Sequence, residues 1–292
     1  MGKKSRKRQS RPEGTPKPKR HEVAYVERPF EGLPAETDLV AMREIIPAAT
    51  LSVRTTAEHG DREVQLVTLL PDMLPAIHRD DDAVLVALQT GMRSGDASRD
   101  VAAALLEALD LEPGSALTTA GLPEPGPRLQ DVLDLTGPFE ITVRDSFDFW
   151  LTDEAKQDDN VAAALEQANA NIVPTVKVDG VRSAYWVRMG AREFLRWARP
   201  EDQEQVLNAL ARLHAARESA VDDGAKFVGA FRSAGILIPV WELAPGTEAD
   251  ELAAPLEAFE AKLEQALAST EALTADERRA RAGIVSRQVS LR

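Results

Sequence analysis

Residues 45–53, IIPAATLSV, and residues 172–178, IVPTVKV, share one pattern, and that pattern decides which fold the sequence predicts. In each stretch a helical run ends at a proline and a strand-like run follows, because proline cannot continue a helix while Val and Thr favour strands. Two later stretches, DVAAALLEAL at 100–109 and ELAAPLEAFE at 251–260, also align. These matches in a shared order predict an internal duplication, with coincidence in an Ala-rich chain as the alternative.

Apolar periodicity around residues 45–53 predicts the elements of the first half. Leu39, Met42 and Ile45 share one face of a helix that ends at Pro47. Alternating residues predict strands, and a polar cap at Ser98 or Asp96 begins a second helix. In chain order we expect a helix at 35–46, strands at 49–55 and 63–70, a short helix or loop at 71–82, a strand at 83–90, a helix at 98–111 and a Pro- and Gly-rich linker at 112–128.

The second half repeats this order with a larger helical insertion. Asp179-Gly180 predicts the type I′ turn of a hairpin, and Pro200 marks the start of the inserted helix. In chain order we expect a helix at 160–173, the hairpin at 175–189, the inserted helix at 201–218, strands at 225–231 and 235–243 and a helix at 251–267.

The predicted fold class is therefore α+β, with two related α-β-β-α-β-α units whose sheets are mixed or antiparallel. A basic N-terminal tail without recurring apolar residues is predicted to be disordered. The expected boundaries are a disordered basic tail at 1–30, a first unit at 31–135, a second unit at 136–270 and a basic C-terminal helix or tail at 271–292.

Composition excludes several classes of site. The 292-residue chain contains no Cys, so it has no disulfide, iron–sulfur cluster or thiolate zinc site. No apolar run reaches the ~18–20 residues of a membrane span, and the basic start is not followed by the apolar stretch of a secretory signal. We expect a soluble, cytoplasmic protein without a cofactor.

Charge is distributed very unevenly along the chain. The net charge is -13, yet residues 1–20 carry +8 and the remainder -21, and the last fifteen residues contain five Arg and no acid. Such a tail predicts contact with a polyanion such as RNA, the ribosome, DNA or an anionic lipid surface, while easier translation or added solubility is the bland alternative. The candidate polyanion-binding residues are Lys3, Lys4, Arg6, Lys7, Arg8, Arg11, Lys17, Lys19 and Arg20.

The segment most typical of a ligand site is AVLVALQTGMRSGDASRD at 83–100, a strand, a glycine loop and a helix. Gly91 and Gly95 could let backbone N–H groups form an anion-binding loop, with Arg93 or Arg99 reaching the anion. No Lys-Ser/Thr pair follows, so the loop is not a P-loop, and acids at the helix start favour an ordinary strand-to-helix connection.

Other polar clusters are better explained by structure than by chemistry. His78 with Asp80, Asp81 and Asp82 resembles a metal site in composition, but consecutive residues cannot all face one ion, so a solvated turn is expected. Asp145 and Asp148 flank Ser146 in a stretch where alternating Phe residues predict a strand. We therefore predict no catalytic residue and no metal ligand.

Aromatic residues are candidates for packing or for partner contact. Tyr185 and Trp186 lie on opposite faces of the predicted hairpin, so one is expected in the core. Core or edge packing is the favoured use of the other as well, and an exposed aromatic that anchors a partner is the alternative. The other tryptophans, which we expect mainly in core or edge packing, are Trp150, Trp197 and Trp241.

Three stretches, RPFEGLPAETDLVAMREIIPAAT at 28–50, DSFDFWL at 145–151 and GILIPVWELAPG at 235–246, resemble an actinobacterial family, a domain of unknown function. The likeness covers nearly the whole chain and implies a bacterial cytosol, but it implies no activity. By the order of its elements the chain also resembles small α+β modules of the secretion-chaperone type.

These observations favour a binding or adaptor protein tethered to a polyanion by its tail. The alternative is an enzyme or nucleotide-binding protein with a dispersed site near Gly91–Gly95. A buried hollow that joins His78, Asp81, Arg93 or Asp148 would favour that alternative.

Overall fold

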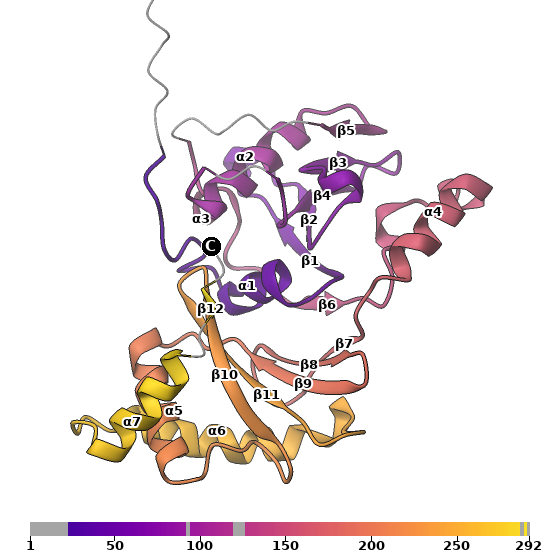
Figure 1. Ribbon diagram of the computed structural model, residues 1–292. Helices are drawn as coiled ribbons and strands as arrows, with labels where there is room; N and C mark the ends of the chain where they lie inside the picture. The colour runs from indigo at the N-terminus through magenta and orange to yellow at the C-terminus, as the bar shows by residue number, and fades with distance from the viewer. Residues whose placement is uncertain (1–22, 92–93, 119–125, 287–288, 291–292) are drawn as a thin grey trace, which may run out of the picture.

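Two six-stranded sheets, one from each half of the chain, form the body of the molecule (Figure 1). The structure is a computed structural model, and it describes residues 23–91, 94–118, 126–286 and 289–290. The prediction of an α+β fold with mixed or antiparallel sheets is confirmed.

The N-terminal sheet has the order β5-β3-β4-β2-β1-β6. Its neighbouring strands are antiparallel except for β2 and β4, which run parallel. The strands are β1 (Ala49–Arg54), β2 (Glu63–Val67), β3 (Ala76–His78), β4 (Val84–Ala87), β5 (Ser115–Leu117) and β6 (Ile141–Val143), and the helices of this half are α1 (Glu36–Glu44), α2 (Ala97–Leu109) and α3 (Leu129–Val132).

The C-terminal sheet has the order β12-β10-β11-β9-β8-β7. Its neighbouring strands are antiparallel except for the short β12, which runs parallel to β10. The strands are β7 (Thr175–Lys177), β8 (Ala184–Met189), β9 (Arg192–Trp197), β10 (Lys226–Ser233), β11 (Ile236–Glu242) and β12 (Val289–Ser290), and the helices are α4 (Asp159–Asn169), α5 (Gln203–Ala215), α6 (Ala253–Ala268) and α7 (Ala275–Ser286).

Helix α1 lies between the two sheets and belongs to both (Figure 1). Its residues Leu39 to Met42 are buried, and one continuous core joins them to Leu51 and Leu66 of the N-terminal sheet and to Tyr185 and Ile238 of the C-terminal sheet. Because the middle of α1 packs against both sheets, consecutive residues from Leu39 to Met42 are buried, which explains why its apolar residues do not form a single stripe.

The other face of the C-terminal sheet packs on α5 and α6. Trp197, Trp241 and Phe259 meet there, with Trp241 and Phe259 edge to face at a centroid distance of 5.5 Å. Both faces of β8 are therefore covered, and both Tyr185 and Trp186 are buried, at 0% and 3% exposure. The favoured prediction of packing is confirmed for both residues, and the alternative of an exposed aromatic that anchors a partner is wrong.

Several local predictions need correction. Residues 76–78 form β3 within the stretch predicted as a short helix or loop, and β5 lies in the segment predicted as a linker. Strand β9 was not predicted as an element, while residues 148–150, predicted as strand, form a 3₁₀ turn in which Phe147 stacks on Trp150. Stacking buries the facing surfaces of these two rings.

Two boundaries also differ. The hairpin of β7 and β8 closes through a loop over residues 178–184 in place of a two-residue turn, since Val178 N–H donates to the Ala184 carbonyl. Residues 26–30, which were predicted to be disordered with the rest of 1–30, belong to the folded body, because Phe30 is fully buried and Arg28 pairs with Glu36. Residues 1–22 of the tail lie outside the described part of the chain.

The two sheets differ in pairing, since β2 is parallel to β4 whereas β9 is antiparallel to β11. A helix, α5, connects β9 to β10, while only a 3₁₀ turn at Pro71–Met73 connects β2 to β3. The internal duplication stays a prediction.

Candidate functional site

The first described residues, 23–28, run along the junction between the two halves, and we name them the entry segment. Val26 N–H donates to the Gly95 carbonyl at 2.9 Å. Arg28 donates to Glu36 at 2.5 and 2.8 Å and to the Pro200 carbonyl at 2.7 Å. The hydrogen bond to Glu36 raises the pKa of Arg28. Residues 26–28, where the basic tail joins the body, are thus fixed to both halves.

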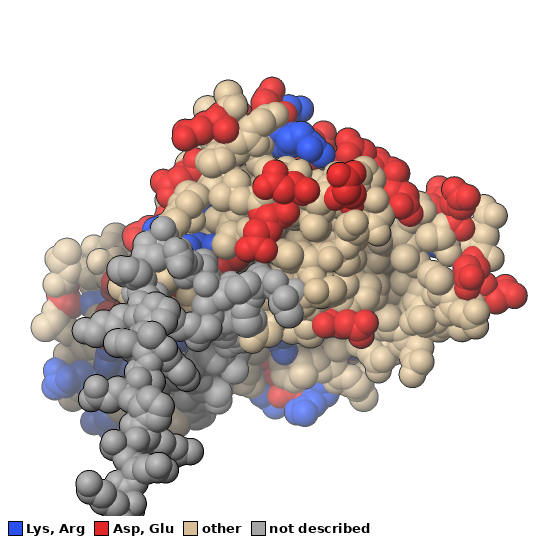
Figure 2. All heavy atoms as spheres, turned by 90° about the horizontal axis from the view of Figure 1, so that it is seen from above, with Lys and Arg blue, Asp and Glu red and all other residues tan. Residues whose placement is uncertain are grey.

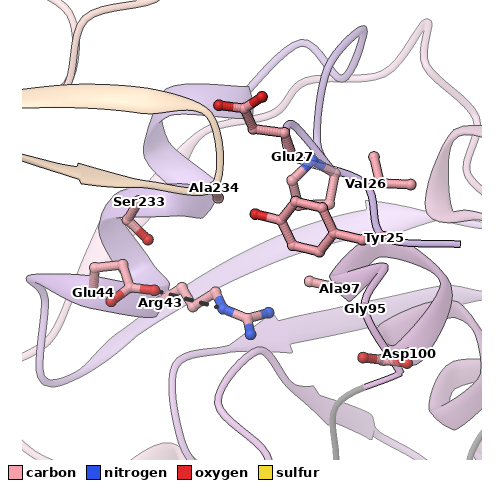
Figure 3. A pocket seen from close by; sticks show the side chains of 11 residues that line it. Tyr25, Val26, Glu27, Arg43, Glu44, Gly95, Ala97, Asp100, Ser233 and Ala234 are labelled. Carbon is pink, nitrogen blue, oxygen red and sulfur yellow. Dashed lines mark ion pairs between the residues drawn. The ribbon is translucent and has the colours of Figure 1, made fainter. Parts of the chain in front are cut away.

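A hollow of about 480 Å³ lies beside this entry segment (Figure 3). Its walls come from four separated stretches: the entry segment, the end of α1, the start of α2 and the turn between β10 and β11. We name it the junction pocket; it is lined by Tyr25, Val26, Glu27, Pro29, Arg43, Glu44, Gly95, Ala97, Asp100, Ser233 and Ala234.

One aromatic ring and four charged groups characterise the junction pocket. The Tyr25 side chain is 79% exposed beside it. Arg43 Nε lies 3.7 Å from Glu44 Oε1, and Asp100 accepts from the Ser94 N–H at 3.0 Å. The carboxylates outnumber the single arginine, so the pocket itself attracts cations and neutral hydrogen-bond donors more than phosphates.

Gly95 lies at the edge of the junction pocket, with a φ of 114° that favours glycine. The N–H groups that an anion would need nearby already bind the chain's own acids: Asp96 accepts from Ser98 and Arg99, and Asp100 accepts from Ser94. Gly91 is exposed, and Arg93 lies outside the described residues. An anion site at Gly91–Gly95 stays a prediction, one in which the ligand would compete with these carboxylates.

Asp96 is the most buried charge near this pocket, with 0% exposure. Its Oδ2 atom lies 3.0 Å from Arg128 Nε and 3.6 Å from Arg99 Nε. The Ser98 hydroxyl next to it donates to Gln130 at 2.6 Å. This cluster fastens the start of α2 to α3, and the sequence indicated only its capping role.

A second hollow, of about 470 Å³, lies at the other end of the N-terminal sheet. It brings Asp81 and Asp148, far apart in sequence, to the same depression. The guanidinium of Arg79 donates to Asp81 at 2.5 and 2.9 Å and lowers the pKa of this carboxyl. Arg144 donates to the Thr50 hydroxyl at 3.2 Å. We name this hollow the polar depression; its charged lining residues are Arg79, Asp81, Arg144, Asp145, Asp148, Asp153 and Lys156.

His78 faces away from solvent and is 3% exposed. Its Nδ1 atom lies 2.7 Å from the Leu111 carbonyl, and its Nε2 atom lies 2.8 Å from Asp82 Oδ1. The predicted solvated turn is therefore wrong for His78, which packs as part of β3. Among the described residues no group of three or more His, Asp or Glu side chains is placed to hold a metal ion.

The nine candidate polyanion-binding residues, Lys3 to Arg20, lie outside the described residues. Seen from above, the visible surface of the described part carries many more acidic than basic side chains (Figure 2). Within it, no helix is long and apolar enough to cross a membrane.

Tyr25 and Arg43 are two lining residues of the junction pocket that no sequence pattern selects. Tyr25 sits in no periodic pattern, and Arg43 reads as an ordinary residue of a helix. A pocket assembled from four separated stretches leaves no local signal in the chain.

Comparison with known proteins yields a family but no activity. The model of a family of unknown function (DUF5926) matches residues 29–292, which is the chain without its basic tail. No curated protein and no solved structure matches.

Proposed function

We propose that this chain, which belongs to the family of unknown function DUF5926, is a cytoplasmic binding or adaptor protein that its basic tail tethers to a polyanion. The body then supplies the specific contact, and the tail supplies attachment to phosphate groups. The shared chemistry of RNA, the ribosome, DNA and anionic lipid is a dense array of such groups.

The observation that carries this proposal is the separation of charge, +8 over residues 1–20 against -21 over the rest. Because the body is acidic, a polyanion is repelled from most of its surface and is attracted to the basic tail. Anchoring of Arg28 to Glu36 and Pro200 supports a tether, because a fixed root connects the tail to both halves of the body.

The test compares the full chain with a variant that lacks residues 1–20. We expect the deletion to abolish co-sedimentation with RNA and ribosomes at low salt and to leave the melting temperature unchanged. A matched control keeps the tail's length and replaces its nine Lys and Arg by Gln. Equal co-sedimentation without the tail would rule the proposal out.

Salt dependence adds a quantitative check. Each phosphate contact to single-stranded nucleic acid contributes a slope of about -0.7 to the plot of log affinity against log salt. Nine cationic residues in the tail can therefore give the full chain a slope no steeper than about -6. With the Gln tail the slope should be close to zero. Vesicles with and without anionic lipid distinguish a membrane surface from nucleic acid.

A second candidate function, nucleotide binding or catalysis, is favoured by the polar depression. Three cationic side chains, Arg79, Arg144 and Lys156, lie there beside Asp145 and Asp148, a set that suits a phosphate with a divalent cation. A thermal-shift screen with nucleotides and Mg²⁺ tests it. Stabilisation that Arg144→Ala removes and Arg54→Ala keeps would support this function, and no shift with any nucleotide would exclude it.

A further inference from the structure

Helix α4 is the one helix of eight or more residues in the described chain that contains no buried residue. It stands away from both sheets (Figure 1). It packs chiefly on the 3₁₀ turn at Ala155–Gln157 just before it. An eleven-residue helix is marginal in water by itself, so this one needs a surface to pack on.

The residues of α4 and of the stretch before it indicate the chemistry of a complementary partner surface. Val161 and Leu165 are half-buried on one side of the helix, and alanines lie beside them. Asp159 and Glu166 are exposed, and the stretch from Asp153 to Asp159 carries four acids and one lysine. A fitting partner surface is apolar and carries positive charge.

The C-terminal sheet has such a surface beyond the area that α1 covers. Register places Tyr185 opposite Arg196, Val187 opposite Phe194 and Met189 opposite Arg192, all on the face that meets α1. Farther along this face Met189 is 44% exposed, and Phe194 and Val240 are half-buried outside both main cores. We name this surface the arginine face: Met189, Arg192, Phe194, Arg196 and Val240.

Arg196 makes the arginine face unusual. Burial lowers the pKa of its guanidinium, and its side chain donates to Met189 Sδ at 3.0 Å. Across the described residues it makes no ion pair, whereas Arg192 pairs with Glu242 at 3.6 Å and stacks on Phe194. A partly desolvated arginine without a carboxylate is costly, and a carboxylate brought by a partner removes that cost.

The helix of the same chain is held away from this face. Asn169 at its end accepts from the Phe147 N–H at 2.8 Å, which ties α4 to the connection after β6. The chain's basic ends do not suit the face either, because they would bring like charge to Arg192 and Arg196. The fitting occupant is the acidic α4 of a second copy.

We propose that the chain forms a two-fold dimer in which α4 of each copy packs on the arginine face of the other. Reciprocal docking uses the same two surfaces twice, so the assembly closes at two copies. Asp159 and Glu166 share the exposed side of α4 and pair with Arg196, and Ala162 and Ala163 between them extend over Met189 and Phe194. The basic tail takes no part, so this inference is independent of the polyanion proposal.

Sedimentation equilibrium on the full chain tests the dimer. We expect twice the chain mass of 31.8 kDa for the natural sequence. Reversing Arg192 and Arg196 to Glu, or reversing Asp159 and Glu166 to Arg, should each raise the dimer dissociation constant by more than about a hundredfold, because like charges then face each other. The four changes together restore opposite charges and should restore the dimer.

Two controls keep the test decisive. Arg212→Glu changes a half-buried arginine of α5 that donates to the Glu271 carbonyl, outside both surfaces, and should leave the dimer intact. Hydrogen exchange should protect the α4 amides in the dimer and lose this protection on dilution. A single 31.8 kDa species whose α4 amides keep the same protection on dilution would overturn the inference. A variant with all four reversals that stays monomeric would overturn it as well.

Discussion

Buried charges in this molecule join elements to each other. Asp96 joins α2 to α3 through Arg128, and Arg199, 5% exposed, joins β9 to α6 through Glu260 at 2.9 Å. Asp38 accepts from the hydroxyls of Ser183 and Tyr185 at 2.6 and 2.5 Å and so joins α1 to the C-terminal sheet. At these positions a charge that is usually read as a functional signal serves as a structural link.

Asp96→Ala should destabilise the protein by about 3 kcal/mol, because it removes a helix cap and leaves two arginines beside a buried gap. Asp202→Ala is the matched control, since Asp202 caps α5 in the same way but is exposed. It should cost about 1 kcal/mol, the value of a cap alone. Urea denaturation measures both, and equal losses would mean that the ion pairs contribute nothing.

Because of Tyr185, we expect the free energy of unfolding to fall at alkaline pH. Its burial, and next the nearby Asp38 carboxylate, raise the pKa of its phenol far above the usual value of about 10. The folded state keeps this proton where the unfolded state loses it, so the resulting stability is complete below about pH 10 and falls as pH rises further. The chain has two tyrosines, so Tyr25→Phe isolates Tyr185. In this variant tyrosinate absorbance should rise only together with unfolding seen by circular dichroism, and a rise in the folded state would contradict the prediction.

At the scale of elements, the turn between β10 and β11 positions the entry segment. Ala234 and Gly235 have φ values of 46° and 74°, as a two-residue type I′ turn requires. A Cβ atom added at Gly235 would lie 2.6 Å from Arg28 Cβ and 2.9 Å from Arg28 Cα. The turn therefore both closes a hairpin and supports the root of the tail.

Substitutions at these two neighbouring positions should have opposite effects. Ala234→Gly should stabilise the protein by about 0.5–1 kcal/mol, because glycine adopts positive φ without strain. Gly235→Ala should destabilise it by more than about 1 kcal/mol, because the added carbon displaces Arg28 from Glu36. Thermal denaturation gives both values, and destabilisation by Ala234→Gly would count against this account of the turn.

At the scale of the whole molecule, the shared position of α1 couples the halves. Leu39 and Met42 pack in one core with residues of both sheets, so removing either sheet exposes the helix to water. A variant with Trp150→Phe leaves Trp186, Trp197 and Trp241, all on the C-terminal sheet, as fluorescence probes. Its fluorescence and far-ultraviolet circular dichroism should report one coincident urea transition. Two separated transitions would show that the halves unfold independently.

Helices and strands were predicted best where the apolar periodicity ends at a proline, a glycine or a capping residue. The helices at 98–111 and 251–267 and the strands at 225–231 and 235–243 correspond to α2, α6, β10 and β11. Strand β3 was missed because its three residues are too few to show a period, and its strand pairing and the His78 contacts come from distant parts of the chain. Of the candidate site residues that the structure describes, which are Gly91, Gly95 and Arg99, only Gly95 lines the junction pocket, whose other walls come from stretches without a shared motif.

The sequence by itself determined the α+β class, the absence of thiol chemistry and the opposite charges of tail and body, because period, composition and charge are properties of neighbouring residues. Only the tertiary structure decided that α1 lies between two sheets and that Asp81 and Asp148 share a depression. It alone also decided that, within the described chain, Arg196 bonds to Met189 without an ion pair and α4 contains no buried residue. These features depend on which distant segments approach one another, and that outcome is set by the burial of apolar surface across the whole molecule.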